Sequence, residues 1–131
     1  MKNRRKHSRT FVQQDVLLYL YDSRSDTNLT GQIVALLEDI SKQGAGLRIS
    51  QVFVDGKHIF YAGLGSETTV LKMVFRSTEG NPEAITTLFA RSVWFDRDMQ
   101  DTTDMPFRIG VKFVEPVPKS CLGCFDRRDT G

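Results

Sequence analysis

Apolar residues in this chain recur at every second position, the period of a β-strand with one buried face. The clearest run is FRIGVKF at residues 107–113, where Phe, Ile, Val and Phe alternate with Arg, Gly and Lys. Aromatic and β-branched residues are abundant, which favours strands over helices. Strands are predicted at residues 11–21, 29–38, 47–50, 71–76, 84–95 and 107–114.

Turn-forming residues separate these predicted strands. The segment YDSRSDTN at residues 21–28 is expected to reverse the chain. Asp55-Gly56 favours a small hairpin within residues 51–67, a stretch that is otherwise hard to interpret. DISKQGAG at residues 39–46 contains two glycines and predicts a break after a buried strand.

About six antiparallel strands in one small domain indicate an all-β fold that closes into a barrel, because closure removes exposed strand edges. So narrow a barrel is filled by its own side chains, and a ligand would therefore bind outside it. Residues 118–128 could form a short helix, although Gly123 disfavours a long one. The 131 residues fit one domain, at 10–131, with an arm at 1–9.

Charge is unevenly distributed along the chain. Residues 1–9 hold five of the 18 Lys and Arg residues and no acid, and the remainder carries 13 basic against 16 acidic residues. A polar, basic arm without periodicity is expected to be flexible until something binds it. Because nucleic-acid binders usually spread positive charge over a whole face, this distribution favours a compact anionic partner over nucleic acid.

Nothing in the sequence predicts a membrane span or a secretory signal. The longest apolar run near the basic start, residues 16–21, is far shorter than the ~18 residues that a span needs. No small-residue cleavage site follows this run. We therefore expect a cytoplasmic protein.

Two short motifs carry the candidate chemistry. Arg5 and Arg9 form an R-x-x-x-R spacing, and paired guanidinium groups can grip phosphate oxygens with charge-assisted hydrogen bonds. Asp39, Ser41 and Gly44 form D-x-S-x-x-G, in which the carboxylate could accept two N–H bonds from a guanine edge and the glycine could permit unusual backbone conformations. Taken singly, each motif has an ordinary alternative: a solvated tail and an Asx-type turn.

The two motifs together resemble the PilZ family. The order is R-x-x-x-R, one strand pair, then D-x-S-x-x-G, and three further stretches agree with it. DISKQGAGL at 39–47 resembles the family's loop and following strand, ARSVWF at 90–95 a later strand, and FRIGVKFVE at 107–115 the last barrel strand. The resemblance covers roughly residues 4–115.

The resemblance implies a six-stranded antiparallel barrel of the PilZ type with a short C-terminal helix, and cyclic di-GMP as its ligand. Arg5 and Arg9 would clasp phosphates and guanine faces, and Arg4 could reach a second stacked nucleotide. Asp39 and Ser41 would read a guanine edge, Gly44 would allow close approach, and Trp94 could stack on a guanine or be an ordinary surface aromatic.

The implied mechanism is a switch in which the ligand draws the arm onto the barrel and so alters a surface for a protein partner. The sequence does not name that partner, and motility, exopolysaccharide and transcription machinery all stay open. Two other functions compete with this one: a protein–protein adaptor of the same fold without nucleotide binding, and a small barrel that binds RNA or single-stranded DNA. The acidic body disfavours the last of these.

No motif supports an enzyme, a cofactor or a metal. Nucleophile-elbow, zincin and P-loop motifs are absent from the sequence. Cys121 and Cys124 form a lone C-x-x-C, and no second pair is present to complete a zinc site. Two reduced thiols are expected, with a disulfide as the alternative in an oxidising environment.

Overall fold

The computed structural model of the chain describes residues 10–76, 85–98 and 104–115. Several predictions fall outside these ranges: the basic arm at 1–9 with Arg4, Arg5 and Arg9, the helix within 118–128, and the cysteine pair.

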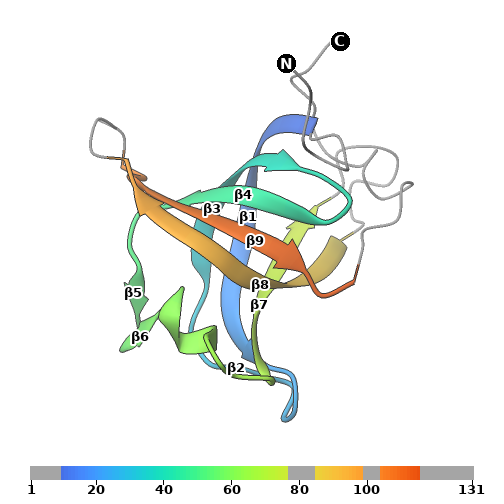
Figure 1. Cartoon of the computed structure of the whole chain (residues 1–131), viewed down its shortest axis with the longest axis vertical. Helices are drawn as coiled ribbons and strands as arrows, with labels where there is room; N and C mark the ends of the chain where they lie inside the picture. The colour runs from blue at the N-terminus through green and yellow to red at the C-terminus, as the bar shows by residue number, and fades with distance from the viewer. Residues whose placement is uncertain (1–9, 77–84, 99–103, 116–131) are drawn as a thin grey trace.

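The described residues form a closed six-stranded antiparallel β-barrel, as the sequence predicts (Figure 1). Around the barrel the strands follow the order β1-β3-β4-β9-β8-β7, and a β1–β7 pairing closes the sheet. Their bounds are β1 Thr10–Asp22, β3 Ile33–Ile40, β4 Gly44–Ile49, β7 Thr69–Arg76, β8 Ile85–Arg97 and β9 Phe107–Phe113. A two-residue strand, β2 Thr27–Asn28, turns back on the end of β1.

Alternation along each strand fills the barrel interior. On β9, Ile109, Val111 and Phe113 are buried, while Lys112 between them faces solvent. The same alternation on the other strands produces one continuous hydrophobic core. Its largest fully buried side chains are Leu18, Leu20, Leu37, Ile40, Leu47, Ile49, Ile59, Leu71, Met73 and Ile109. This packed interior leaves the outer wall as the surface for a ligand.

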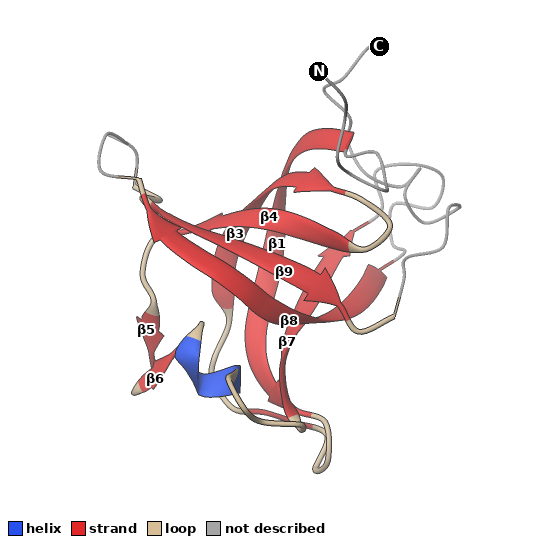
Figure 2. Ribbon diagram, in the orientation of Figure 1, coloured by secondary structure: helices blue, strands red, loops and turns tan. Residues whose placement is uncertain are grey.

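Residues 51–67 lie at one end of the barrel, where they form a two-stranded hairpin outside the barrel sheet and a short 3-10 helix (Figure 2). The hairpin joins β5 Phe53–Val54 to β6 Lys57–His58, and the helix η1 spans Tyr61–Gly63. Asp55 and Gly56 both have positive φ, at 52° and 80°, as a tight hairpin turn requires. Ile59 is 1% exposed and belongs to the core. The predicted hairpin is confirmed, and the segment closes that end of the barrel.

Several predicted boundaries were wrong, and the strand expected at residues 29–38, for example, begins only at Ile33. The break expected at residues 39–46 covers only Ser41–Gln43, because β3 continues through Ile40 and β4 already begins at Gly44. Glycine is a poor strand former in isolation, but here it allows two strands to approach closely. The strand expected at residues 84–95 also ends later than predicted, since β8 continues to Arg97.

Candidate functional site

Three β-bulges lie at one level of the barrel wall. The pairing register shifts between Phe11 and Gln14 on β1, between Leu37 and Asp39 on β3, and between Ser92 and Trp94 on β8. A bulge inserts one extra residue into a strand and so reverses the face on which later side chains project. Bulges of this kind are common beside functional sites, where they redirect a side chain.

The bulges determine which way Asp39 and Trp94 point. If the pairing before each bulge continued unchanged, Asp39 would oppose Ala45 and Trp94 would oppose Ile109, both inward-facing residues of the core. After the bulges, Asp39 instead opposes Gly46 and Trp94 opposes Gly110, on the outer face.

These four residues form one row across the barrel wall. Asp39 pairs with Gly46, Gly46 pairs with Gly110, and Gly110 pairs with Trp94, across strands β3, β4, β9 and β8. Residues directly opposite one another in adjacent strands project from the same face of a sheet. We call this set, Asp39, Gly46, Gly110 and Trp94, the outer row.

The two glycines of the outer row leave space for their neighbours. A Cβ at Gly46 would lie 3.0 Å from Oδ2 of Asp39, and a Cβ at Gly110 would lie 2.1 Å from Nε1 of Trp94. The carboxylate therefore rests over β4 and the indole over β9. Trp94 stays 43% exposed. Because adjacent strands lie ~4.8 Å apart, a carboxylate and an aromatic surface are brought side by side.

Ser41 has a structural position in the turn that follows Asp39. It is 5% exposed, and its backbone N–H donates to the carbonyl of Gly44 at 2.8 Å. Its Oγ accepts from the N–H groups of Gln43 and Gly44, each at 3.3 Å. This hydroxyl thus holds the three-residue turn in shape, and its expected contact with a guanine edge stays a prediction.

Gly44 is needed for a reason that the sequence did not predict. A Cβ there would lie 2.2 Å from the carbonyl oxygen of Val111 on β9. Its φ is not in the left-handed region, so conformational freedom is not the explanation. Gly44 instead allows β4 to pack closely against β9. The carbonyl of Gln43 also accepts from the N–H of Phe113 at 2.7 Å, which ties the turn to β9.

The arginines of the predicted motif lie outside the described residues, but the described chain begins next to the motif's other half. Thr10, the residue after Arg9, pairs with Ile40, and Phe11 pairs with Asp39. The start of β1 therefore lies beside the D-x-S-x-x-G turn. The position of Thr10 does not establish where the side chain of Arg5 or Arg9 lies.

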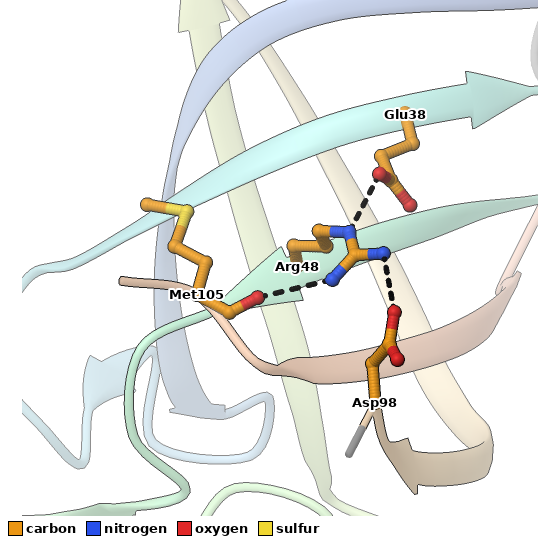
Figure 3. Close-up of polar contacts among 4 residues, drawn as sticks. All are labelled: Glu38, Arg48, Asp98 and Met105. Carbon is orange, nitrogen blue, oxygen red and sulfur yellow. Dashed lines mark hydrogen bonds and ion pairs between the residues drawn. The ribbon is translucent and has the colours of Figure 1, made fainter. Parts of the chain in front are cut away.

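Arg48 organises the polar contacts next to the outer row, a role that sequence analysis missed (Figure 3). Its Nε donates to Glu38 at 2.7 Å, one terminal nitrogen donates to Asp98 at 3.2 Å, and the other donates to the carbonyl of Met105 at 3.2 Å. Its side chain is only 18% exposed. These contacts join β3, β4, the end of β8 and the segment before β9.

The two glycines of the outer row, which were also not predicted as site residues, share one sequence signal. Gly46 and Gly110 are prominent only when the strand register is known, because each is a glycine within an otherwise good strand. A glycine in a strand interior often marks a bulge or a close approach of another group. That rule could have identified Gly110 in FRIGVKF, but not the indole that covers it.

At the closed end of the barrel, His58 lies within an aromatic cluster. Its ring contacts Phe53, Tyr61 and Phe95, with centroids 5.0, 4.4 and 5.5 Å apart. Nδ1 accepts from the backbone N–H groups of Phe60 and Tyr61, each at 3.2 Å. Burial lowers the pKa of His58, because a cationic ring is poorly solvated there. The neutral ring therefore acts as an acceptor that caps η1.

Comparisons with known proteins assign no family: no family model matches the chain, and no curated protein matches it. Within residues 10–76, 85–98 and 104–115, His, Cys, Asp and Glu side chains form no cluster of three or more that could hold a metal ion. The described part of the chain also contains no helix long and apolar enough to cross a membrane.

Proposed function

We propose that this protein is a cyclic di-GMP-binding sensor domain of the PilZ type, which acts by ligand-driven ordering of its N-terminal arm and not by catalysis. The observation that carries the proposal is the outer row. Two bulges turn Asp39 and Trp94 outward, and two glycines bring them together beside the strand into which the R-x-x-x-R segment leads.

The chemistry of these groups fits a guanine nucleotide. A carboxylate can accept two hydrogen bonds from the N1–H and exocyclic amine of guanine, while an exposed indole offers a stacking surface worth ~1–3 kcal/mol per base. Arg5 and Arg9, and Arg4 just before them, supply the cations that two phosphates require. Ser41 and Gly44 support this site by fixing the turn after Asp39.

Ligand binding would be converted into a signal through the arm. The arm is joined to Thr10. Phosphates bound near Asp39 would therefore draw the arm across the wall around the outer row. This change would create or remove a surface for a protein partner in the cytoplasm. The partner's machinery, whether for motility, exopolysaccharide or transcription, is not specified by the residues described.

A second candidate is a protein–protein adaptor that binds no nucleotide. It is favoured by the exposed apolar residues at the closed end of the barrel: Phe53 is 64% exposed, Tyr61 57% and Leu64 53%. Large exposed apolar groups that lie together often mark an interaction surface. The adaptor reading leaves the outer row without a purpose, and we therefore rank it second.

Isothermal titration calorimetry with cyclic di-GMP tests the proposal. We expect micromolar or tighter binding by the full chain, and a loss of roughly two to four decades of affinity in an Arg5→Ala/Arg9→Ala variant, since each charged hydrogen bond contributes ~1.5–3 kcal/mol. Asp39→Ala should also weaken binding. Lys57→Ala on β6, which lies outside the barrel sheet, is the matched loss of a cation and should bind normally.

Two results would overturn the proposal. The first is absence of heat with cyclic di-GMP at protein concentrations suited to micromolar affinity. The second is an arginine double variant that binds as tightly as the wild type. Tight binding of single-stranded DNA or RNA with a steep salt dependence would instead indicate a nucleic-acid-binding barrel.

A further inference from the structure

The outward face of β9 carries two cations that the fold leaves uncommitted. Arg108 and Lys112 lie two residues to either side of Gly110, so all three project from the same face. Among the described residues, neither the Arg108 nor the Lys112 side chain forms an ion pair or a hydrogen bond. Their Cα atoms are ~13 Å apart along the strand.

Arg48, on the neighbouring strand β4, does not have this freedom. Arg48 and Arg108 oppose each other directly on adjacent strands. Arg48 is held by two carboxylates and one carbonyl (Figure 3), whereas Asp96, directly opposite Arg108 on its other side, forms no ion pair with it. Arg48 is thus a structural residue, and Arg108 retains a guanidinium group able to bind an anion.

Arg108 is positioned by the outer row. Its guanidinium carbon lies 5.9 Å from the centroid of the Trp94 ring, within the range of a cation–π contact. Trp94 is in turn seated on Gly110. The stacking surface of Trp94 therefore has Arg108 at one side. Lys112, which is exposed, lies at the other side, two residues beyond Gly110.

We propose that Arg108 and Lys112 form a phosphate-binding ledge on β9, which holds the phosphates of a guanine nucleotide while its base stacks on Trp94. This inference rests on the proposed function, because it names a second set of contacts for the same ligand. The ledge consists only of residues of the barrel, and we expect it to bind the ligand weakly when Arg5 and Arg9 are absent.

Trp94 provides a direct readout, because it is the single tryptophan of the chain. Its fluorescence can be titrated with cyclic di-GMP in the full-length wild type and in the Arg5→Ala/Arg9→Ala variant. We expect quenching in both, at higher ligand concentration in the variant. Adding Arg108→Ala and Lys112→Ala to that variant should abolish the remaining quenching.

In a chain with an intact arm, Arg108→Ala should weaken binding by about tenfold to a hundredfold, the range for a charged hydrogen bond. Arg108→Lys keeps the charge but loses the forked geometry, and should recover part of that loss. Lys57→Ala serves again as the control. Far-ultraviolet circular dichroism and thermal unfolding establish that each variant folds.

The outcomes separate the two proposals. If calorimetry detects cyclic di-GMP binding but the Arg108→Ala/Lys112→Ala variant binds as the wild type does, the ledge is refuted and the sensor function stands. If the wild type binds no cyclic di-GMP, the sensor function fails, and GTP becomes the probe. Quenching of Trp94 by GTP that depends on Arg108 and Lys112 then supports the ledge, and its absence overturns it.

Discussion

Replacing Gly110 by alanine should displace the indole of Trp94 while leaving the barrel folded. The added Cβ would lie 2.1, 2.2 and 2.7 Å from three atoms of the indole, far inside van der Waals contact. Either the ring or the strand must move. Because β9 pairs with both β4 and β8, rotation of one side chain, at ~0.5–1.5 kcal/mol, is the cheaper adjustment.

The expected change in stability is small. Trp94 is 43% exposed, and a Trp side chain contributes up to ~250 Å², so about 140 Å² is covered in the folded state. Returning half of that area to water costs about 2 kcal/mol. Alanine offsets ~0.5–1 kcal/mol by restricting the unfolded chain. A net loss of about 1 kcal/mol should lower Tm by about 2–5 °C.

Three measurements on Gly110→Ala test this reasoning: thermal unfolding, the emission maximum of Trp94, and its quenching by acrylamide. We expect a red-shifted emission, easier quenching, and an affinity for cyclic di-GMP close to that of Trp94→Ala. Gly46→Ala is the matched control, because the atoms nearest to its added Cβ belong to the flexible end of Asp39, the first at 3.0 Å. It should leave the emission unchanged. Unchanged emission and quenching in Gly110→Ala would show that the indole does not rest on Gly110.

Two further changes test other parts of the structure. Arg48→Met removes the three polar contacts described above and takes from Glu38 and Asp98 the cation that they share. This change should lower the free energy of unfolding in urea by about 1–3 kcal/mol. The exposed Arg97→Met should change it by less than ~0.5 kcal/mol, and equal effects would contradict the structural role of Arg48. The pKa of His58 is lowered in the folded state, so the unfolded chain binds a proton more readily than the folded chain does. The neutral His58 ring therefore contributes its full stability above the ordinary histidine pKa of 6.5. That contribution is lost as the pH falls below 6.5. Between about pH 7.5 and about pH 5.5, a range that spans the ordinary histidine pKa, the Tm of the wild type should therefore fall more steeply than the Tm of His58→Gln. Parallel plots of Tm against pH for the two proteins would refute the role of a neutral His58 ring.

The barrel is predictable from the sequence because its strands follow a simple rule. In residues 107–113 every second side chain is apolar and is buried, apart from a partly covered Phe107. The Asp55-Gly56 hairpin is equally predictable from the sequence, since two positive φ angles in succession suit few other residue pairs. Both features are local, and a local pattern is sufficient to predict them.

Other features depended on tertiary contacts. Nothing in residues 51–67 marks Ile59 as a core residue, because the segment has no periodicity. Gly44 and Gly46 indicated a break, yet both lie in β4, where glycine is required by the carbonyl of Val111 and the side chain of Asp39. In each case the reason for the residue is a neighbour far away in sequence.

The candidate site shows most clearly why sequence patterns alone were insufficient. Counting alternate positions along ARSVWFDR does not show that Trp94 faces outward, because the bulge before it shifts the register by one residue. The same is true of Asp39 on β3. Two bulges on different strands, on either side of a pair of glycines, cost ladder hydrogen bonds and packing that a purely structural barrel would keep. Their coincidence at one level of the wall is the strongest physical reason to seek a ligand there, and it does not depend on any family resemblance.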